Sequence, residues 1–158
     1  MEVIVSWAVH VVTAEELKRQ MPRGRGGAPA WLELLTAQER QAYSADDGGC
    51  LVVAREGATV GGWAGFVRVA PKGCEISQFV VLGEHRGKGL GTRLMQGLLN
   101  EVRRMGYARV VSRIEPWCPE WRAFYKGHGF VFVNEEDEDK AVCGGGRGEG
   151  AAMELVME

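Results

Sequence analysis

The chain has 158 residues, a length that suits one domain with a hydrophobic core of its own. Hydrophobic residues make up 46% and charged residues 25%, which is the usual mix of a globular protein and excludes a disordered chain. The net charge is −2, so we do not expect a nucleic-acid partner, which would normally need a basic protein. Glycine is abundant, at 23 residues, but without the strict period of collagen, so the glycines must act locally.

The cysteines and the start of the chain bear on metals, compartment and membranes. Cys50, Cys74, Cys118 and Cys143 form no CxxC pair and have no histidine at ligand spacing, so no metal is expected. Their wide spread suits a reducing compartment, and we expect a cytoplasmic protein, with the nucleus as an open alternative. The apolar start, MEVIVSWAVHVV, lacks a basic segment and a cleavage site and is too short to span a bilayer, so no membrane partner is expected.

The predicted elements begin with a strand over residues 3–11, whose alternate residues from Val3 to Val11 are apolar. His10 lies on its other face, where a polar residue is ordinary. Two helices are predicted next, at 13–21 and 31–43.

Strands are then predicted near 50–55, 59–70 and 74–82. Three glycines in the second of them, Gly61, Gly62 and Gly65, weaken its strand propensity and indicate a bulge or a close approach.

The clearest helix covers 92–105, where apolar residues recur at 3.6 spacing and Gly106 suits the position after the helix end. A strand at 109–114, a short helix at 119–126 and strands at 130–133 and 151–157 complete the chain. The acidic and glycine-rich stretch 134–150 has no packing pattern and is expected to be a mobile loop. We therefore predict a single α/β (α+β) domain over residues 1–158 with a mixed sheet.

The most informative stretch joins the predicted strand at 74–82 to the predicted helix at 92–105 and reads GEHRGKGLG over residues 83–91. Glycines let backbone N–H groups approach a ligand, and the helix N-terminus adds unpaired donors and the positive end of its dipole. The segment from His85 to Arg113, both included, contains seven Arg or Lys residues and one Glu. The stretch therefore predicts a cradle for phosphate or pyrophosphate.

Two familiar phosphate loops do not fit this stretch. A Walker A loop needs four residues between its glycines and a Ser or Thr after its lysine, but Gly83 and Gly87 enclose three residues and Lys88 precedes Gly89. A dinucleotide loop needs a wider gap before its third glycine, which here comes too early, at Gly91. A P-loop nucleotide-binding enzyme is therefore disfavoured.

The pattern that remains is R-x-x-G-x-G, formed by Arg86, Gly89 and Gly91. Farther along, residues 124–130 read FYKGHGF, which matches F/L-Y-x-x-x-G-F at the end of a short helix that enters a strand. The two motifs, in this order, resemble the GNAT superfamily of N-acetyltransferases, which use acetyl-CoA. The resemblance covers residues 50–133.

This resemblance implies a fold and a cofactor site. The fold would be a GNAT-like mixed, mostly antiparallel central sheet of six or seven strands flanked by about four helices, with a splay between the strands at 74–82 and 109–114. The pantetheine arm of acetyl-CoA would lie in that splay, and Val81 N–H would polarise the thioester carbonyl. The cofactor-binding residues that it implies are Phe79, Val80, Val81, Arg86, Gly87, Lys88, Gly89, Leu90, Gly91 and Thr92.

The resemblance also implies direct acetyl transfer to a primary amine. Tyr125 matches the family tyrosine that serves as general acid towards the leaving thiolate. Glu75 is the candidate base, because histone-acetylating members carry E-I-x-x-x-x-V on the matching strand. A water chain is the alternative, and Ser77 could hold such a water. Cys118 stands where many small-molecule members have an Asn, which puts the contacts of that Asn in doubt.

The acceptor stays open among peptidyl lysine, a protein N-terminus and a small amine. The resemblance places Trp31 and Tyr43 as wall residues of the acceptor site. Acidic residues at 46–47 and 135–139 near the acceptor would favour a cationic amine, and a solvated charge run is the alternative for 135–139. The competing hypothesis is a non-catalytic acyl-CoA-binding regulatory module on the same fold, against which Tyr125 and Glu75 argue. The oligomeric state, monomer or homodimer, also stays open.

Overall fold

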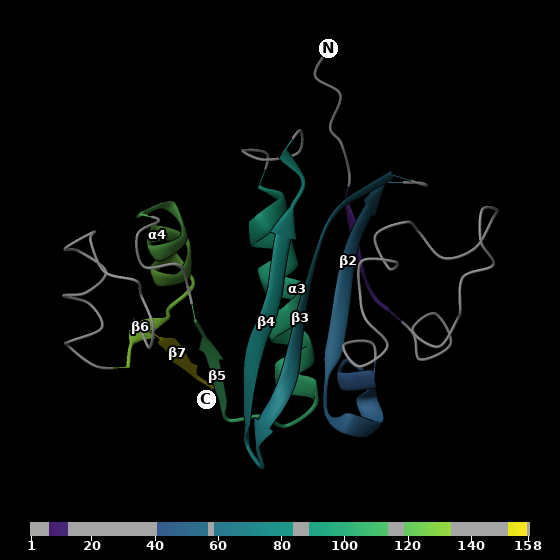
Figure 1. The fold of residues 1–158 in the computed structure, drawn as a ribbon. Helices are drawn as coiled ribbons and strands as arrows, with labels where there is room; N and C mark the ends of the chain where they lie inside the picture. The colour runs from purple at the N-terminus through teal and green to yellow at the C-terminus, as the bar shows by residue number, and fades with distance from the viewer. Residues whose placement is uncertain are drawn as a thin grey trace. The chain divides into compact units, whose positions relative to one another are not determined.

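The computed structural model describes residues 7–12, 41–56, 59–83, 89–113, 119–133 and 152–157. These ranges hold the α-helices α3 (Leu90–Arg104) and α4 (Pro119–Gly127), a 3-10 turn, η2 (Ala45–Asp47), and helical residues at 41–42. Their strands are β1 (Ala8–Val11), β2 (Cys50–Glu56), β3 (Thr59–Ala70), β4 (Gly73–Val81), β5 (Arg109–Ser112), β6 (Val131–Phe132) and β7 (Met153–Val156) (Figure 1). Neither helix is long and apolar enough to cross a membrane.

Most of the predicted elements are confirmed, with small changes at their ends. The helix predicted at 92–105 begins two residues earlier, at Leu90, and Gly106 follows it with a φ of 80°. The strand predicted at 109–114 ends at Ser112. The helix predicted at 13–21, most of the one predicted at 31–43 and the stretch 134–150 lie outside the described residues.

The first strand is described from Ala8 onward. Its register pairs Val9 with Ala54 and Val11 with Val52, so Val9 and Val11 share one face as predicted. Val11 at the strand end is 42% exposed, whereas Val12 on the other face is 4% exposed. Val12 N–H donates to the Leu51 carbonyl at 2.8 Å, and the Val12 side chain joins the core.

The strands form one mixed sheet in the order β1-β2-β3-β4-β5-β7-β6. The pairs β1–β2, β2–β3, β5–β7 and β6–β7 are antiparallel, and β4–β5 is parallel. The β4–β5 register runs from Gly73 with Arg109 to Ile76 with Ser112, and β4 continues beyond it to Val81. This sheet confirms the predicted class.

By its internal contacts the chain divides into two compact units. The first contains residues up to Arg68 together with Ser77–Glu101, and the second contains Val69–Ile76 together with the residues from Val102 onward. The organisation as a single domain stays a prediction.

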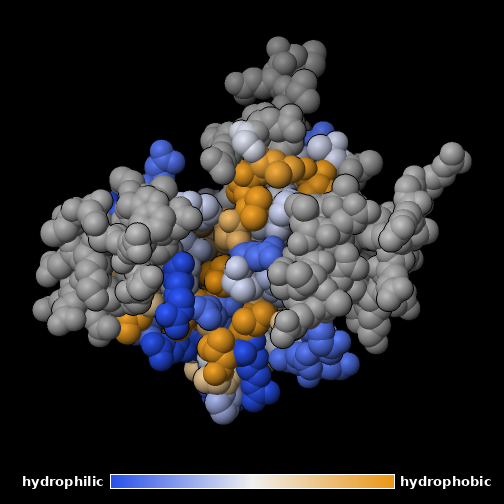
Figure 2. Space-filling model, viewed as in Figure 1, coloured by the Kyte–Doolittle hydropathy of each residue, from blue (hydrophilic) through white to orange (hydrophobic). Residues whose placement is uncertain are grey.

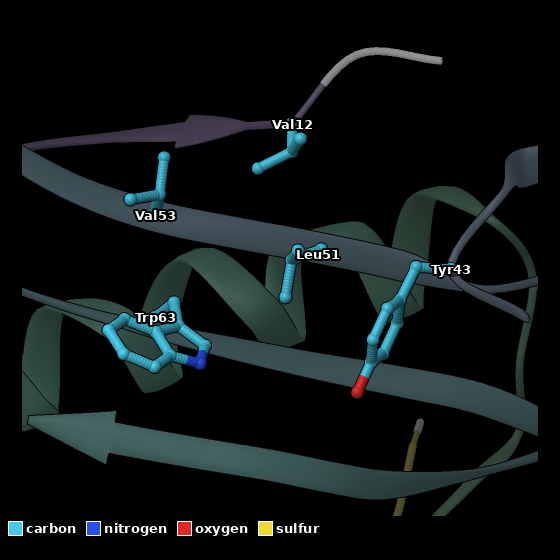
Figure 3. Packing of buried hydrophobic residues seen from close by; sticks show 5 residues of the cluster. All are labelled: Val12, Tyr43, Leu51, Val53 and Trp63. Carbon is cyan, nitrogen blue, oxygen red and sulfur yellow. The ribbon is translucent and has the colours of Figure 1, made fainter. Parts of the chain in front are cut away.

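The first unit has core side chains on both faces of its strands. Register pairs Leu51 with Gly65 and Val53 with Trp63, so these residues share one face, together with Val12 and Tyr43 (Figure 3). Each of the five side chains in Figure 3 is at most 6% exposed. The helix α3 passes behind these strands in Figure 3, and its Leu94 and Leu98 are fully buried. Each buried leucine contributes about 1.5–3 kcal/mol relative to an exposed one.

All three glycines of β3 allow close approaches, and Gly61 also forms a bulge. The β2–β3 register shifts between Ala54 and Arg55, which leaves Gly61 as the additional residue. A Cβ at Gly61 would lie 2.6 Å from the side chain of Leu90 and 2.7 Å from the ring of Trp7. A Cβ at Gly65 would lie 2.5 Å from the ring of Tyr43. The predicted bulge and close approach are therefore both present.

The second unit is built around β5. Val110 and Ser112 pair with Leu155 and Met153 of β7, so these four residues share one face of the sheet. After α4, the N–H groups of His128 and Phe130 both donate to the Tyr125 carbonyl at 3.1 Å, and Gly129 adopts a φ of 93°. This turn ends the helix and buries Phe130, which is 1% exposed.

The most exposed large apolar side chains of the described strands are valines near strand ends: Val11, Val69, Val131 and Val156. In Figure 2, hydrophobic residues gather in the upper centre of the drawn face, and hydrophilic and hydrophobic residues are mixed lower down.

Candidate active site

The end of β4 is held against β3 by glycines. Phe79, Val80 and Val81 are half-buried on β4, and the next residue, Leu82, donates its N–H to the carbonyl of Gly61 at 2.9 Å. A Cβ at Gly62 would lie 3.0 Å from the Leu94 side chain and 3.2 Å from the Cα of Val81. Glycine at this position therefore lets the end of β4 lie close to β3 and to α3.

The helix α3 begins with backbone donors that have no acceptor within the helix. The N–H of Arg93 donates to the Gly89 carbonyl at 3.2 Å, so the amides of Leu90, Gly91 and Thr92 precede this hydrogen bond. The first turn contains no acidic residue that would offset the positive end of the dipole. Gly89 is exposed with a φ of 78° and open space at its Cβ position. This helix start fits an anionic group such as pyrophosphate. Arg86, Gly87 and Lys88 lie outside the described residues.

Tyr125 lies on α4 and is 3% exposed. Its ring packs edge-on against Phe130, with 5.1 Å between centroids, and lies 6.0 Å from the ring of Trp121. Its side chain shares a hydrogen bond with Ser112 of β5. Burial raises the pKa of Tyr125 above its ordinary value, and the Ser112 hydrogen bond offsets part of this rise. The hydroxyl therefore stays protonated at neutral pH and is able to donate.

Glu75 lies on β4 and forms an ion pair. Arg113 donates from Nε to the Glu75 Oε1 at 2.7 Å, and the side chains of Glu75 and Arg113 are 25% and 66% exposed. Protonation of Glu75 would remove the negative charge on which this ion pair depends.

Tyr125 and Glu75 lie on opposite faces of the sheet of the second unit. The register pairs Glu75 with Val111 and Ile76 with Ser112, and neighbouring pairs point to opposite sides. Tyr125 bonds to Ser112 and so lies on the Ile76 side, whereas Glu75 points to the other side. The structure therefore does not bring the two candidate proton-transfer groups to one face.

Ser77, the residue expected to hold a water, has a side-chain partner in the first unit. Its Oγ lies 2.6 Å from the hydroxyl of Tyr43. Tyr43 is 3% exposed and belongs to the core cluster, so the expected wall residue is a core side chain that reaches β4. Next to Ser77 on β4, Gln78 accepts a hydrogen bond at Oε1 from Trp63 Nε1 at 3.0 Å.

The acidic residues expected near the acceptor are only partly described. Asp46 and Asp47 are exposed in η2, and Gln41 Nε2 donates to Asp47 Oδ2 at 3.1 Å. Trp31, Cys118 and residues 135–139 lie outside the described part of the chain.

Sequence reasoning missed Ser112 and Arg113, the partners of Tyr125 and Glu75. Both lie at the end of the strand predicted at 109–114, on opposite sides. Their partners depend on the register of the parallel β4–β5 pair, and no local turn fixes that register. The alternation of side chains along the predicted strand indicates that Ser112 and Arg113 lie on opposite faces. It does not indicate which residues they contact.

Comparison with protein families decides the relationship. The family model described as the acetyltransferase (GNAT) family matches residues 12–130. The chain belongs to this family. Family membership confirms the resemblance that the two motifs predicted and supports acetyl transfer as the general activity. A search of curated proteins found no match.

Solved GNAT structures share the fold at low sequence identity. The IAA acetyltransferase from Bacillus cereus is 21% identical, with a TM-score of 0.62 over 82% of this chain and 79% of that one. The PaiA N-acetyltransferase from Thermoplasma acidophilum, solved with coenzyme A, is 13% identical, with a TM-score of 0.66 over 96% and 99%. A GNAT acetyltransferase from Elizabethkingia anophelis with acetyl-CoA bound is 13% identical, with a TM-score of 0.65 over 96% and 98%. At these identities the likeness is one of fold.

Metal ligands do not gather in the described ranges, where no group of three or more His, Cys, Asp or Glu residues is placed to hold an ion.

Proposed function

We propose that this GNAT protein transfers the acetyl group of acetyl-CoA directly to a primary amine. The observation that carries the proposal is the buried Tyr125 hydroxyl, kept protonated by its surroundings, at the position where the family motif has its general acid. A peptidyl lysine, a protein N-terminus and a small amine are the three acceptor classes to be compared.

Two segments would bind acetyl-CoA, which supplies the acetyl group and the leaving sulfur. The backbone of Phe79, Val80 and Val81 would pair with the pantetheine arm, with Val81 N–H directed at the thioester carbonyl. The amides of residues 86–92, namely Arg86, Gly87, Lys88, Gly89, Leu90, Gly91 and Thr92, would hold the pyrophosphate. The backbone donors at the start of α3 support this assignment. The relatives solved with CoA or acetyl-CoA support it as well.

Tyr125 and Glu75 would handle the two protons. Tyr125 donates to the leaving sulfur, and Glu75 removes the amine proton. Because Glu75 lies on the other face of the sheet from Tyr125, this base acts through water. A water chain without Glu75 is the alternative.

A screen for CoA-thiol release tests the proposal. Wild-type protein is incubated with acetyl-CoA and, separately, lysine-containing peptides, peptides with a free N-terminus, polyamines and simple amines. Release with one class, and its loss in Tyr125→Phe, would support the enzyme and name the acceptor. Acetyl-CoA binding without release across the whole panel would favour the non-catalytic module. Thermal stabilisation by ATP and not by acetyl-CoA would contradict both.

Several properties of the protein stay predictions. They are a single domain, a cytoplasmic location, no metal, and no nucleic-acid or membrane partner. The oligomeric state, monomer or homodimer, is open.

A further inference from the structure

Ser112 is one of two buried polar residues in the described ranges, at 3% exposed, and Ser44 is the other, at 8%. The role of Ser44 is local, because its Oγ accepts a hydrogen bond from Asp46 N–H at the start of η2. Ser112 instead reaches from β5 to the side chain of Tyr125 on α4. Burial of a hydroxyl without a hydrogen bond costs folding free energy, and the contact with Tyr125 removes this cost for Ser112.

Both ends of this hydrogen bond lie on well-fixed elements. Ser112 lies between two strands, in register with Ile76 on one side and Met153 on the other. The ring of Tyr125 is packed against Phe130 and Trp121. A phenol held in this way has one main freedom, the rotation of its O–H bond, and a hydroxyl partner restricts that rotation.

We infer that Ser112 is a positioning residue for the proposed acid: it orients the Tyr125 hydroxyl and donates a hydrogen bond to the phenolate that Tyr125 becomes. This inference rests on the proposed function. In the transfer step, the amine nitrogen bonds to the acetyl carbon, and the bond between that carbon and sulfur breaks. Sulfur keeps the electron pair and takes the proton of Tyr125, while the nitrogen gives up one proton to the base. Solvent returns a proton to Tyr125, so the products are an amide and a thiol.

The electrostatics agree with this role. Two effects act on the pKa of Tyr125: burial raises it, and the hydrogen bond with Ser112 lowers it. Cys74 shares the Ser112 face through its register with Val110, and the ring of His128 packs against Phe124, the neighbour of Tyr125 on α4. Without Ser112 the burial would act alone, and the phenol would give up its proton less readily.

Two readouts test the inference. The first is the titration of Tyr125, followed by fluorine NMR in protein labelled with fluorotyrosine. The chain has three tyrosines, and Tyr125→Phe identifies the resonance. The second is steady-state acetyl transfer. In Ser112→Ala we expect the Tyr125 titration to move to higher pH and kcat to fall about tenfold, with KM for acetyl-CoA unchanged. Ser112→Thr keeps the hydroxyl and should restore both. Ser44→Ala removes the other buried serine and should change neither.

The outcomes separate this inference from the proposed function. An unchanged Tyr125 titration in Ser112→Ala would overturn the inference whatever the activity. A shifted titration with unchanged kcat would also overturn it. A loss of kcat without a shift, or without rescue by Ser112→Thr, would show a structural role and would count against it. If Tyr125→Phe keeps full activity, the proposed acid fails, and with it the catalytic part of the inference.

Discussion

At the scale of single residues, the two candidate proton-transfer groups have opposite surroundings. Tyr125 is packed among aromatic rings and bonds to one hydroxyl, whereas Glu75 is partly exposed and paired with a guanidinium. Burial of a neutral phenol favours its protonated form, which suits a donor. An exposed ion pair is worth little to stability, so Glu75 is free of a strong structural role.

Tyr125→Phe should lower kcat by about 100-fold or more, because general acid catalysis commonly contributes that factor. Acetyl-CoA affinity should stay nearly unchanged, since the proposed cofactor contacts are backbone groups of other segments. Stopped assays of CoA release and calorimetric titration with acetyl-CoA measure the two quantities. Tyr107→Phe is a matched control, because Tyr107 is also buried, at 7% exposed, in the second unit. Unchanged turnover in Tyr125→Phe would remove Tyr125 from the acid role.

Glu75→Gln tests whether Glu75 acts as the catalytic base or only forms a surface ion pair with Arg113. We expect kcat to fall about 100-fold, as for loss of a general base, while the free energy of unfolding changes by less than about 1 kcal/mol. Glu154→Gln is the control, since Glu154 is in register with Val111 on the Glu75 face and pairs with Arg109. Equal activity of Glu75→Gln and Glu154→Gln would favour the water chain.

At the scale of elements, α3 carries a glycine with positive φ at each end. Gly89 precedes the helix with a φ of 78°, and Gly106 follows it with a φ of 80°. A Cβ added at either glycine would have no neighbour within 4 Å. The two glycines therefore have the same backbone conformation and the same free space, and they differ only in which end of α3 they adjoin.

Alanine at either position should destabilise the protein by about 1 kcal/mol, because a side chain disfavours the left-handed region. Only Gly89→Ala should also weaken acetyl-CoA binding, since it displaces the amides at the start of α3. Denaturant unfolding and calorimetric titration of both variants check this pair. Equal acetyl-CoA affinities in Gly89→Ala and Gly106→Ala would contradict the proposed pyrophosphate site.

The bulge of β3 offers a second comparison. Gly61→Ala would press a Cβ against the Trp7 ring and the Leu90 side chain, so we expect a loss of about 1–3 kcal/mol in unfolding free energy. Gly83→Ala has open space around its Cβ and should be close to neutral. Urea unfolding of both variants measures the difference. A Gly61→Ala protein as stable as wild type would show that the close packing at Gly61 relaxes without loss.

Element positions followed from the sequence, whereas contacts did not. The strand at 59–70 was predicted with its observed ends, and its glycines indicated the bulge, because backbone demands are local. The burial of Val12 was not predicted, because it depends on pairing with Leu51. Ser112 was missed for the same reason: motif spacing placed Tyr125 on a helix but contained no information on β5.

At the scale of the whole molecule, the titration of Tyr125 and His128 affects the pH range over which the protein is most stable. Burial lowers the pKa of His128, whose ring packs against Phe124 with 4.8 Å between centroids, and burial raises the pKa of Tyr125. His128 is therefore held neutral and Tyr125 is held protonated, and both conditions are met between the ordinary pKa values of 6.5 and 10.0.

The free energy of unfolding should fall on both sides of this window. A lowered pKa for His128 means that the unfolded chain binds more protons below pH 6.5, so stability decreases as the pH falls from 6.5 towards the pKa of folded His128. A raised pKa for Tyr125 means that the folded chain keeps its proton above pH 10.0, so stability decreases as the pH rises beyond that value. Denaturant unfolding across pH measures both slopes. His128→Gln should reduce only the acid slope and Tyr125→Phe only the alkaline one, and slopes that both variants leave unchanged would assign the pH dependence to other groups.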